Sequence, residues 1–328
     1  MGIVVQKFGG SSLRGLNNSS KVLSRIRECI DDGDDPVVVV SAIGRRGDPY
    51  ATDTLIEQLE QISGRIDPKK KDLMMSCGET ISAALVSHLL EVNNMPAEPL
   101  TGFQAGILTD NNFNSAEIID IDTSNIKKLI GEGKIAVVTG FQGITRDGEI
   151  TTLGRGGSDI TAISLGGYLN AKRVDIFTDV PGVALIDPNI VPYTDYIKSI
   201  SYDDMYELAS NGAKVLHPKS VEIAKKFNIM VRVTSTFEKV PGTLVTNEYS
   251  RERIIGIAVV NDRLYYTFKI YYCKEYKISV LENIKAFLQK NYKNILGVKF
   301  NNHCITIRTN TNDVFAFSRK LYDALIRQ

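Results

Sequence analysis

The sequence predicts an α/β protein with a mostly parallel central sheet covered by helices in three layers, followed by a small α+β domain. Strand-like apolar runs alternate with amphipathic helical patterns over about the first 245 residues, and this alternation is typical of βαβ units. Residues 36–42, PVVVVSA, are almost continuously β-branched, as in a strand buried on both faces. Pro, Gly and charged residues cluster at 238–253, where we expect this pattern to end.

Each element of the first domain follows from its apolar spacing. Strands are predicted at the short apolar runs 2–8, 36–42, 134–141, 173–180 and 229–235. Helices are predicted where apolar residues recur every three or four positions, at 19–31, 53–62, 79–92, 158–170, 202–211 and 218–227. The basic run at 69–71 is expected to be the solvated start of a helix. We assign these elements to a first domain over residues 1–247.

Residues 253–328 follow a different pattern, which predicts one small α+β domain. A strand-forming stretch at 254–271 precedes a helix at 278–290, two strands within 295–309 and a helix at 312–327. The expected order is therefore strand–helix–strand–strand–helix.

Composition excludes several classes of protein. The 328 residues include 39 basic and 38 acidic side chains, a formal net charge of +1, so no basic field favours nucleic acid or an anionic membrane. No apolar run approaches the ~18 residues of a membrane span, and no signal peptide is evident. The four cysteines, Cys29, Cys77, Cys273 and Cys304, form no CxxC pair. We therefore expect a cytoplasmic protein with free thiols and, with three histidines, no histidine-rich metal site.

Three glycine-rich turns lie at strand ends or helix starts: KFGGSS (7–12), SAIGRRGDPYATD (41–53) and LGRGGSD (153–159). Glycine lets backbone N–H groups approach phosphate oxygens, and a following helix adds a partial positive charge. Lys7, Arg155 and Asp159 stand at these openings. Each turn alone could be a simple tight turn. Because neither GxxxxGK[ST] nor GxGxxG occurs, the combination indicates phosphoryl transfer by another nucleotide-binding design.

Five motifs in order resemble those of the aspartokinases, the aspartate kinases of the amino acid kinase superfamily: KFGGSS (7–12), SCGET (76–80), GRGGSD (154–159), FTDVPGV (177–183) and GAKVLHP (212–218). The resemblance covers about residues 2–246. The 41–53 stretch resembles the bacterial branch linked to diaminopimelate and dipicolinate supply. The implied fold is the amino acid kinase fold.

The resemblance implies ATP-dependent phosphorylation of the L-aspartate side-chain carboxylate, the first step of the pathway to lysine, diaminopimelate, threonine and methionine. A carboxylate nucleophile is ionised at pH 7, so no general base is required. The implied catalytic residues are Lys7 and Asp159, which orders Lys7. The implied aspartate-binding residues are Ser41, Thr52, Glu79, Arg155 and Ser158. The implied ATP-binding residues are Lys7, Gly9, Gly10, Ser11, Thr178, Asp179 and Lys214, with Mg²⁺ as the metal cofactor and no protein metal site.

Two departures from the family pattern remove nucleotide contacts. Asn189 replaces the usual arginine, and Ala184 stands where an aromatic residue is common, so weaker ATP affinity is expected. The tail resembles one ACT domain, where aspartokinases usually carry two, and it could regulate the enzyme or join a homodimer or larger homo-oligomer. Two alternatives stay open: a kinase for another acidic amino acid, and a non-catalytic amino-acid sensor.

Overall fold

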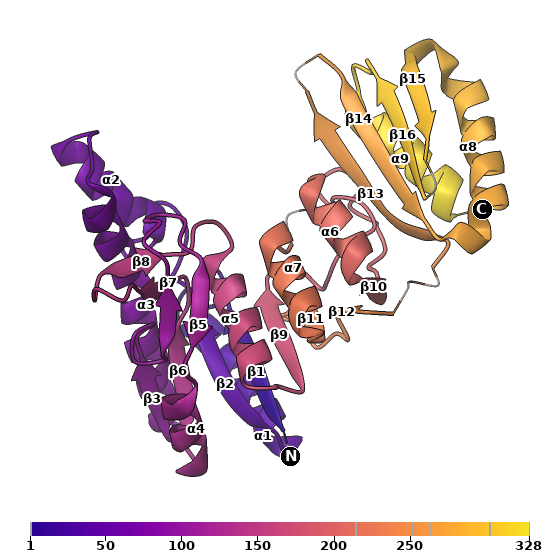
Figure 1. The fold of residues 1–328 in the computed structure, drawn as a ribbon. Coiled ribbons are helices and arrows are strands. Elements are labelled where there is room, and N and C mark those ends of the chain that lie inside the picture. Colours follow the sequence, from indigo (N-terminus) through magenta and orange to yellow (C-terminus); the bar gives the residue numbers. More distant parts are fainter. Residues whose placement is uncertain are drawn as a thin grey trace. The chain divides into compact units, whose positions relative to one another are not determined.

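The computed structural model describes residues 2–213, 215–248, 250, 252–262, 264–301 and 303–327. They form two compact units (Figure 1). The first contains the chain up to Pro181 together with Glu222–Pro241, and the second contains Gly182–Val221 together with the residues from Gly242 onward. Packing thus groups residues 182–221 with the tail. The domain boundary that the sequence predicts between residues 247 and 253 stays a prediction.

The first unit is built on six parallel strands, and the mixed α/β architecture confirms the predicted fold class. In spatial order they are β11 (Val231–Ser235), β9 (Arg173–Thr178), β1 (Ile3–Phe8), β2 (Asp35–Val40), β6 (Ile135–Thr139) and β3 (Ala97–Leu100). The helices of this unit are α1 (Leu16–Asp31), α2 (Thr52–Ile62), α3 (Pro68–Glu91), α4 (Ser124–Gly131) and α5 (Gly157–Tyr168). Helix α7 (Pro218–Phe227) begins in the second unit and ends in the first.

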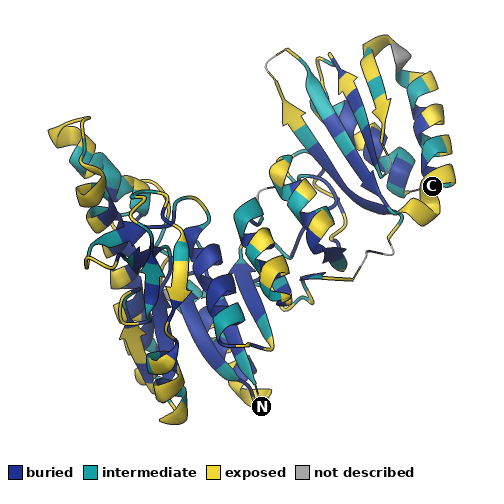
Figure 2. Cartoon of the chain, in the orientation of Figure 1, coloured by how far each residue is buried: buried dark blue, intermediate teal, exposed yellow. Residues whose placement is uncertain are grey.

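Strand alternation in β1 divides its side chains between the two faces of the sheet. Phe8 packs in a core cluster with Val22 and Ile26 of α1 and with Val38 of β2, and its ring stacks on Phe177 at 4.7 Å. Helix α5 packs against β1, β2 and β9. Figure 2 shows the strands of this sheet as buried along most of their length. The preceding side chain, Lys7, therefore points to the opposite face from Phe8.

A second, four-stranded sheet in this unit was not predicted. Its order is β5 (Ile118–Ile121), β4 (Ile107–Thr109), β7 (Gln142–Ile144) and β8 (Ile150–Thr152). Strands of three or four residues are too short to display a period-two pattern, so sequence spacing could not reveal them.

Helix α3 is longer and more apolar than the helix predicted at 79–92, and its first turn contains the basic run 69–71, where a helix start was expected. It begins at Pro68, eleven residues before the predicted 79, because Asp67 caps its first turn by accepting from the backbone N–H groups of Lys69 and Lys70 at 3.0 and 3.3 Å. An 18-residue window has a mean hydropathy of 1.3, so its length and composition would allow a membrane span. Half of that window is buried within the protein, as in a core helix.

The second unit contains the parallel pair β10 (Ser199–Ser201) and β12 (Thr243–Thr246), and helix α6 (Tyr202–Ser210). Its four-stranded antiparallel sheet has the order β13 (Ile254–Asn261), β14 (Tyr266–Tyr272), β16 (Cys304–Thr309) and β15 (Ile295–Phe300). Helices α8 (Lys277–Asn291) and α9 (Val314–Ile326), and 3₁₀ turns at Lys274–Tyr276 and Tyr292–Asn294, complete it. The 254–271 stretch is thus a pair of antiparallel strands, not the single strand expected, because the chain reverses after Asn261, where the Asp262 N–H donates to the Tyr265 carbonyl.

A buried carboxylate on α3 fixes the loop and strand beside it. Asp72 is fully buried and accepts from the backbone N–H groups of Asn114 and Thr152 at 2.9 and 3.0 Å and from the Thr152 hydroxyl at 2.6 Å. Burial raises the pKa of Asp72. Its three hydrogen bonds join α3 to β8 and to the loop before β5.

Replacing Asp72 with Asn should destabilise the first unit by about 2–4 kcal/mol, because an amide NH₂ would face backbone donors. Chemical denaturation of the full chain measures this difference. Glu91→Gln, at the exposed end of the same helix, should change stability by less than about 0.5 kcal/mol. Equal stabilities for both variants would contradict the assigned role of Asp72.

Candidate active site

A pocket of about 920 Å³ in the first unit collects residues from all three glycine-rich turns and from α3. It opens where β1, β2 and β6 end and where α2 and α5 begin, the edge at which parallel α/β sheets bind ligands. The structure brings together eight of the predicted site residues at its walls: Lys7, Gly10, Ser41, Thr52, Glu79, Arg155, Ser158 and Asp159.

An ion pair at the back of this pocket joins the end of β1 to the first turn of α5. The Lys7 ammonium lies 2.7 Å from the Asp159 carboxylate, and the two side chains are only 13% and 12% exposed. Strand alternation sends Lys7 toward α5, as described above. The ammonium is therefore held at a fixed place in the pocket while part of it still faces the cavity.

Glycines allow the start of α5 to form the pocket wall. Gly156, the N-cap residue, has φ +71°, a left-handed conformation that favours glycine. A Cβ on Gly157 would meet the Phe141 ring. The first turn of α5 thus presents Ser158 and the positive end of the helix dipole to the cavity.

Gly10 permits a second close approach. Any side chain there would clash with the backbone oxygens of Ala42 and Gly44, and the Gly10 carbonyl accepts from the Gly44 N–H at 3.0 Å. The loops after β1 and β2 are therefore in direct backbone contact beside Lys7.

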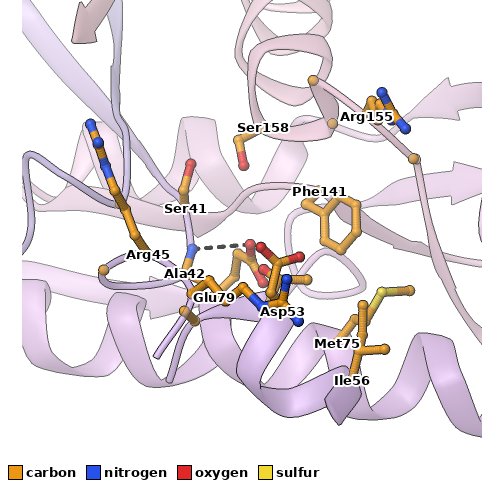
Figure 3. A pocket seen from close by; sticks show the side chains of 18 of the residues that line it. Ser41, Ala42, Arg45, Asp53, Ile56, Met75, Glu79, Phe141, Arg155 and Ser158 are labelled. Atoms are coloured by element: carbon orange, nitrogen blue, oxygen red, sulfur yellow. Dashed lines mark hydrogen bonds between the residues drawn. The ribbon is translucent and has the colours of Figure 1, made fainter. Parts of the chain in front are cut away.

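Glu79 is the most unusual group in the pocket. It is 3% exposed, and its Oε1 accepts from the Ala42 N–H at 3.0 Å, the bond drawn in Figure 3. Its other oxygen, Oε2, has no hydrogen-bond partner among the described residues. Burial raises the pKa of Glu79 to about 8. Such a carboxyl group favours a ligand that brings a cation or a hydrogen-bond donor.

The pocket carries five cationic side chains, Lys7, Arg45, Arg46, Lys71 and Arg155, and three acidic ones, Asp53, Glu79 and Asp159. Arg45 pairs with Asp179 at 2.5 Å and Arg46 pairs with Glu57 at 2.6 Å. Arg155 is exposed and makes no ion pair with any described residue. This balance suits an anionic ligand, and Arg155 has a free guanidinium fork for a carboxylate or phosphate.

Sequence reasoning missed several pocket residues. Arg45, Arg46 and Asp53 lay within the 41–53 turn but received no role, and Phe141 was expected only as the last residue of the strand at 134–141. Lys71 was expected to be part of a solvated run, yet it is only partly exposed and lines the pocket. Lys71 lines the pocket as part of α3, which begins at Pro68, before the helix predicted at 79–92.

Four predicted nucleotide residues lie outside the pocket wall, and Lys214 falls outside the described residues. Gly9 and Ser11 form the turn after β1, where their carbonyls accept from Ser12 and Asn18 respectively. Thr178 ends β9 and donates to Asp179 at 3.2 Å. Asp179 is linked to the pocket through its pair with Arg45.

The two residues that depart from the family pattern have local partners. The Asn189 amide donates to the Asp187 carboxylate at 3.0 Å. Ala184 forms an isolated antiparallel bridge with Tyr196. The weaker ATP affinity expected from these positions stays a prediction.

Comparison with known proteins agrees with this geometry. The sequence model of the amino acid kinase family matches residues 2–235. The aspartokinase of Geobacillus stearothermophilus is 46% identical over 261 residues, which cover 79% of this chain and 63% of that protein. Aspartokinase 1 of Bacillus subtilis (strain 168) is 43% identical over 270 residues, covering 80% and 67%. The chain therefore spans about two thirds or less of the length of these relatives.

A solved structure extends the likeness in fold to nearly the whole chain. E. coli aspartokinase III, in complex with aspartate and ADP, matches 98% of this chain and 84% of its own with a TM-score of 0.66 and 24% identity. At 24% identity, this match supports a shared fold and nothing further. The family match and the sequence relatives show that the chain belongs to the amino acid kinase family, among its aspartokinases.

Proposed function

We propose that this protein is an aspartate kinase. It transfers the γ-phosphoryl group of ATP to the side-chain carboxylate of L-aspartate, giving 4-phospho-L-aspartate and ADP, the first step of the aspartate-family pathway. The observation that carries the proposal is one pocket holding the Lys7–Asp159 pair, the buried Glu79 and the unpaired Arg155. The names of its relatives, both aspartokinases, support the substrate.

The two ends of aspartate match two groups of the pocket. The α-carboxylate pairs with the Arg155 fork, and the α-ammonium supplies the cationic partner that Glu79 Oε2 lacks among the described residues. Ser41, Thr52 and Ser158 line the cavity around them. With both ends held, the side-chain carboxylate has a defined direction toward the phosphoryl donor.

Phosphoryl transfer here requires charge neutralisation more than proton transfer. The aspartate carboxylate oxygen attacks the γ-phosphorus, the bond from that phosphorus to the bridging oxygen breaks, and ADP leaves with the electron pair. Lys7 offsets the repulsion between the two anions, and Asp159 holds the ammonium in place at 2.7 Å. The backbone of Gly9, Gly10 and Ser11 and the start of α5 add N–H groups beside the phosphates.

The nucleotide side is assigned to Thr178, Asp179 and Lys214. Among the described residues, no group of three or more His, Cys, Asp and Glu side chains could hold a metal. Mg²⁺ in kinase sites is held chiefly by nucleotide phosphates, water and one or two carboxylates, and Asp159, beside Lys7, is the carboxylate that would hold it here. Bound there, Mg²⁺ would neutralise charge on the phosphates.

We further propose a homodimer or larger homo-oligomer in the cytoplasm. Strand β15 is an edge strand of its sheet, and its Leu296 and Phe300 are 57% and 52% exposed. An exposed edge with apolar side chains is suited to pairing with another chain.

Lys7→Ala should reduce aspartate-dependent ADP release at least about 1,000-fold, because it removes the fixed cation at the phosphoryl position. The assay contains ATP, Mg²⁺ and L-aspartate, with hydroxylamine to trap the acyl phosphate. Lys21→Ala, at an exposed position on α1, serves as the matched control and should keep wild-type activity. Turnover on another acidic amino acid instead of aspartate would change the substrate assignment, and silence on every acid by the folded protein would favour an amino-acid sensor.

The kcat/KM for aspartate should rise by up to about tenfold per pH unit between pH 6 and 8, since only ionised Glu79 can pair with the substrate ammonium. The sign follows from the pKa of about 8: the competent, ionised fraction grows as pH approaches that value. Glu79→Gln is neutral at every pH and should lower kcat/KM for aspartate and flatten this profile. Identical profiles for wild type and variant would refute the role of Glu79.

A further inference from the structure

The second compact unit joins the tail to residues 182–221, which lie within the family match over 2–235. On the proposed function, these residues continue directly from the nucleotide residues Thr178 and Asp179 and include the GAKVLHP motif at 212–218. Two separate sets of contacts attach them to the tail, one through α9 and the other through β14.

The first set is centred on Tyr322 of α9, a fully buried side chain. Its hydroxyl accepts from the Asp195 N–H at 2.8 Å and donates to the Asp195 carboxylate at 3.0 Å. Nearby, the Tyr193 hydroxyl donates to Asp323 at 3.2 Å, and the Arg327 guanidinium lies 4.4 Å from the centre of the Tyr193 ring. Helix α9 thus holds both the backbone and the side chains of this loop.

The segment that contains Asp195 is hydrogen-bonded to residues 183–185, which follow Thr178 and Asp179 in the chain. The Asp195 carbonyl accepts from the Leu185 N–H at 2.9 Å, and the Leu185 carbonyl accepts from the Ile257 N–H of β13 at 2.6 Å. On the other side, the Ile197 N–H donates to Val183 at 2.8 Å. Residues 183–185 are therefore held between the 195–197 segment and the tail.

The second set is centred on Lys269 of β14. Its ammonium donates to the Asn211 amide oxygen at 2.5 Å. The Asn211 NH₂ group donates to the Tyr271 hydroxyl at 2.9 Å and to the Glu207 carbonyl of α6 at 2.7 Å. A Cβ on Gly256 would clash with Leu208 of α6, so β13 and α6 also pack closely. Asn211 directly precedes the GAKVLHP motif.

We infer that Tyr322 and Lys269 are positioning residues for the nucleotide, acting through Asp195 and Asn211 respectively. The inference rests on the proposed function, since it takes the segments near 179 and 212–218 as the nucleotide side. Tyr322 bonds the Asp195 N–H and Lys269 bonds the Asn211 amide oxygen, so their loss loosens segments that must be ordered to bind a nucleotide. The aspartate pocket lies wholly in the first unit, so aspartate binding does not depend on them directly.

The test compares Tyr322→Phe and Lys269→Met with wild type in the whole 328-residue chain. KM for ATP and the Kd for ADP, measured by calorimetric titration, should each rise about threefold to tenfold, the loss expected for one or two hydrogen bonds. KM for aspartate and kcat should stay within about twofold. Lys269→Arg, which keeps a cationic donor, should restore most of the nucleotide affinity.

Tyr272→Phe is the matched control. Like Tyr322, Tyr272 is a buried tyrosine of the tail, but it lies in β14. Its hydroxyl donates to the Asn301 carbonyl within the tail. It controls for general loss of tail stability and should leave the Kd for ADP unchanged. Equal effects on the two substrates, an equal effect from Tyr272→Phe, or an unchanged Kd for ADP in both test variants would overturn the inference.

The same experiment separates the two proposals. Wild-type protein that releases no ADP in the presence of aspartate would sink the proposed reaction, and the ADP titrations alone would then decide the inference. Active wild type with test variants of unchanged ADP affinity would leave the reaction standing and sink the inference.

Discussion

The Lys7–Asp159 ion pair is the contact on which the arrangement of the pocket depends. It joins the end of the central strand β1 to the first turn of α5, and each partner is placed by a different local rule. Lys7 faces α5 because Phe8 is taken into the core on the other side of the sheet. Asp159 faces β1 because Gly156 and Gly157 let α5 begin close to the strand ends. One pair thus sets the distance between a fixed cation and a helix N-terminus, two groups that both attract phosphate.

Glu79 imposes the opposite kind of constraint, because it costs stability in the absence of substrate. In the unfolded chain the pKa of this carboxyl would be near 4.5, whereas burial raises its pKa to about 8 in the folded protein. Because the pKa of Glu79 is raised on folding, its contribution to the free energy of unfolding is most favourable at low pH. That contribution declines as pH rises from about 4.5 to 8. A group this unfavourable is expected where a ligand compensates for it. The position follows from Gly78, since a Cβ there would strike Ala42 and keep α3 away from the loop after β2.

How much could be predicted from the sequence differs between the fold and the site. Long strands with β-branched runs, such as β2 and β6, and the glycine-rich start of α5 are visible because their local chemistry has few alternatives. The resemblance supplied Glu79 and Arg155, whose roles have no local signature. The pairing of Arg45 with Asp179 joins residues 134 positions apart, and the small sheet is made of very short strands. Neither leaves a periodic trace, so both required the three-dimensional structure.

The two units differ in which residues supply the hydrogen bonds that order their functional segments. The residues assigned to aspartate lie in the first unit, and the contacts that position them close within it, as in the bond from the Ala42 N–H to Glu79 and the backbone contact between the loops after β1 and β2. Residues 182–221 belong to the same family match but obtain key partners from Tyr322, Lys269 and Ile257 of the tail. Buried polar groups are costly when unpaired, so this segment depends on the tail for its own order. On the proposed function, a tail that supplies these hydrogen bonds would affect nucleotide binding whether or not it also binds an effector or a second chain.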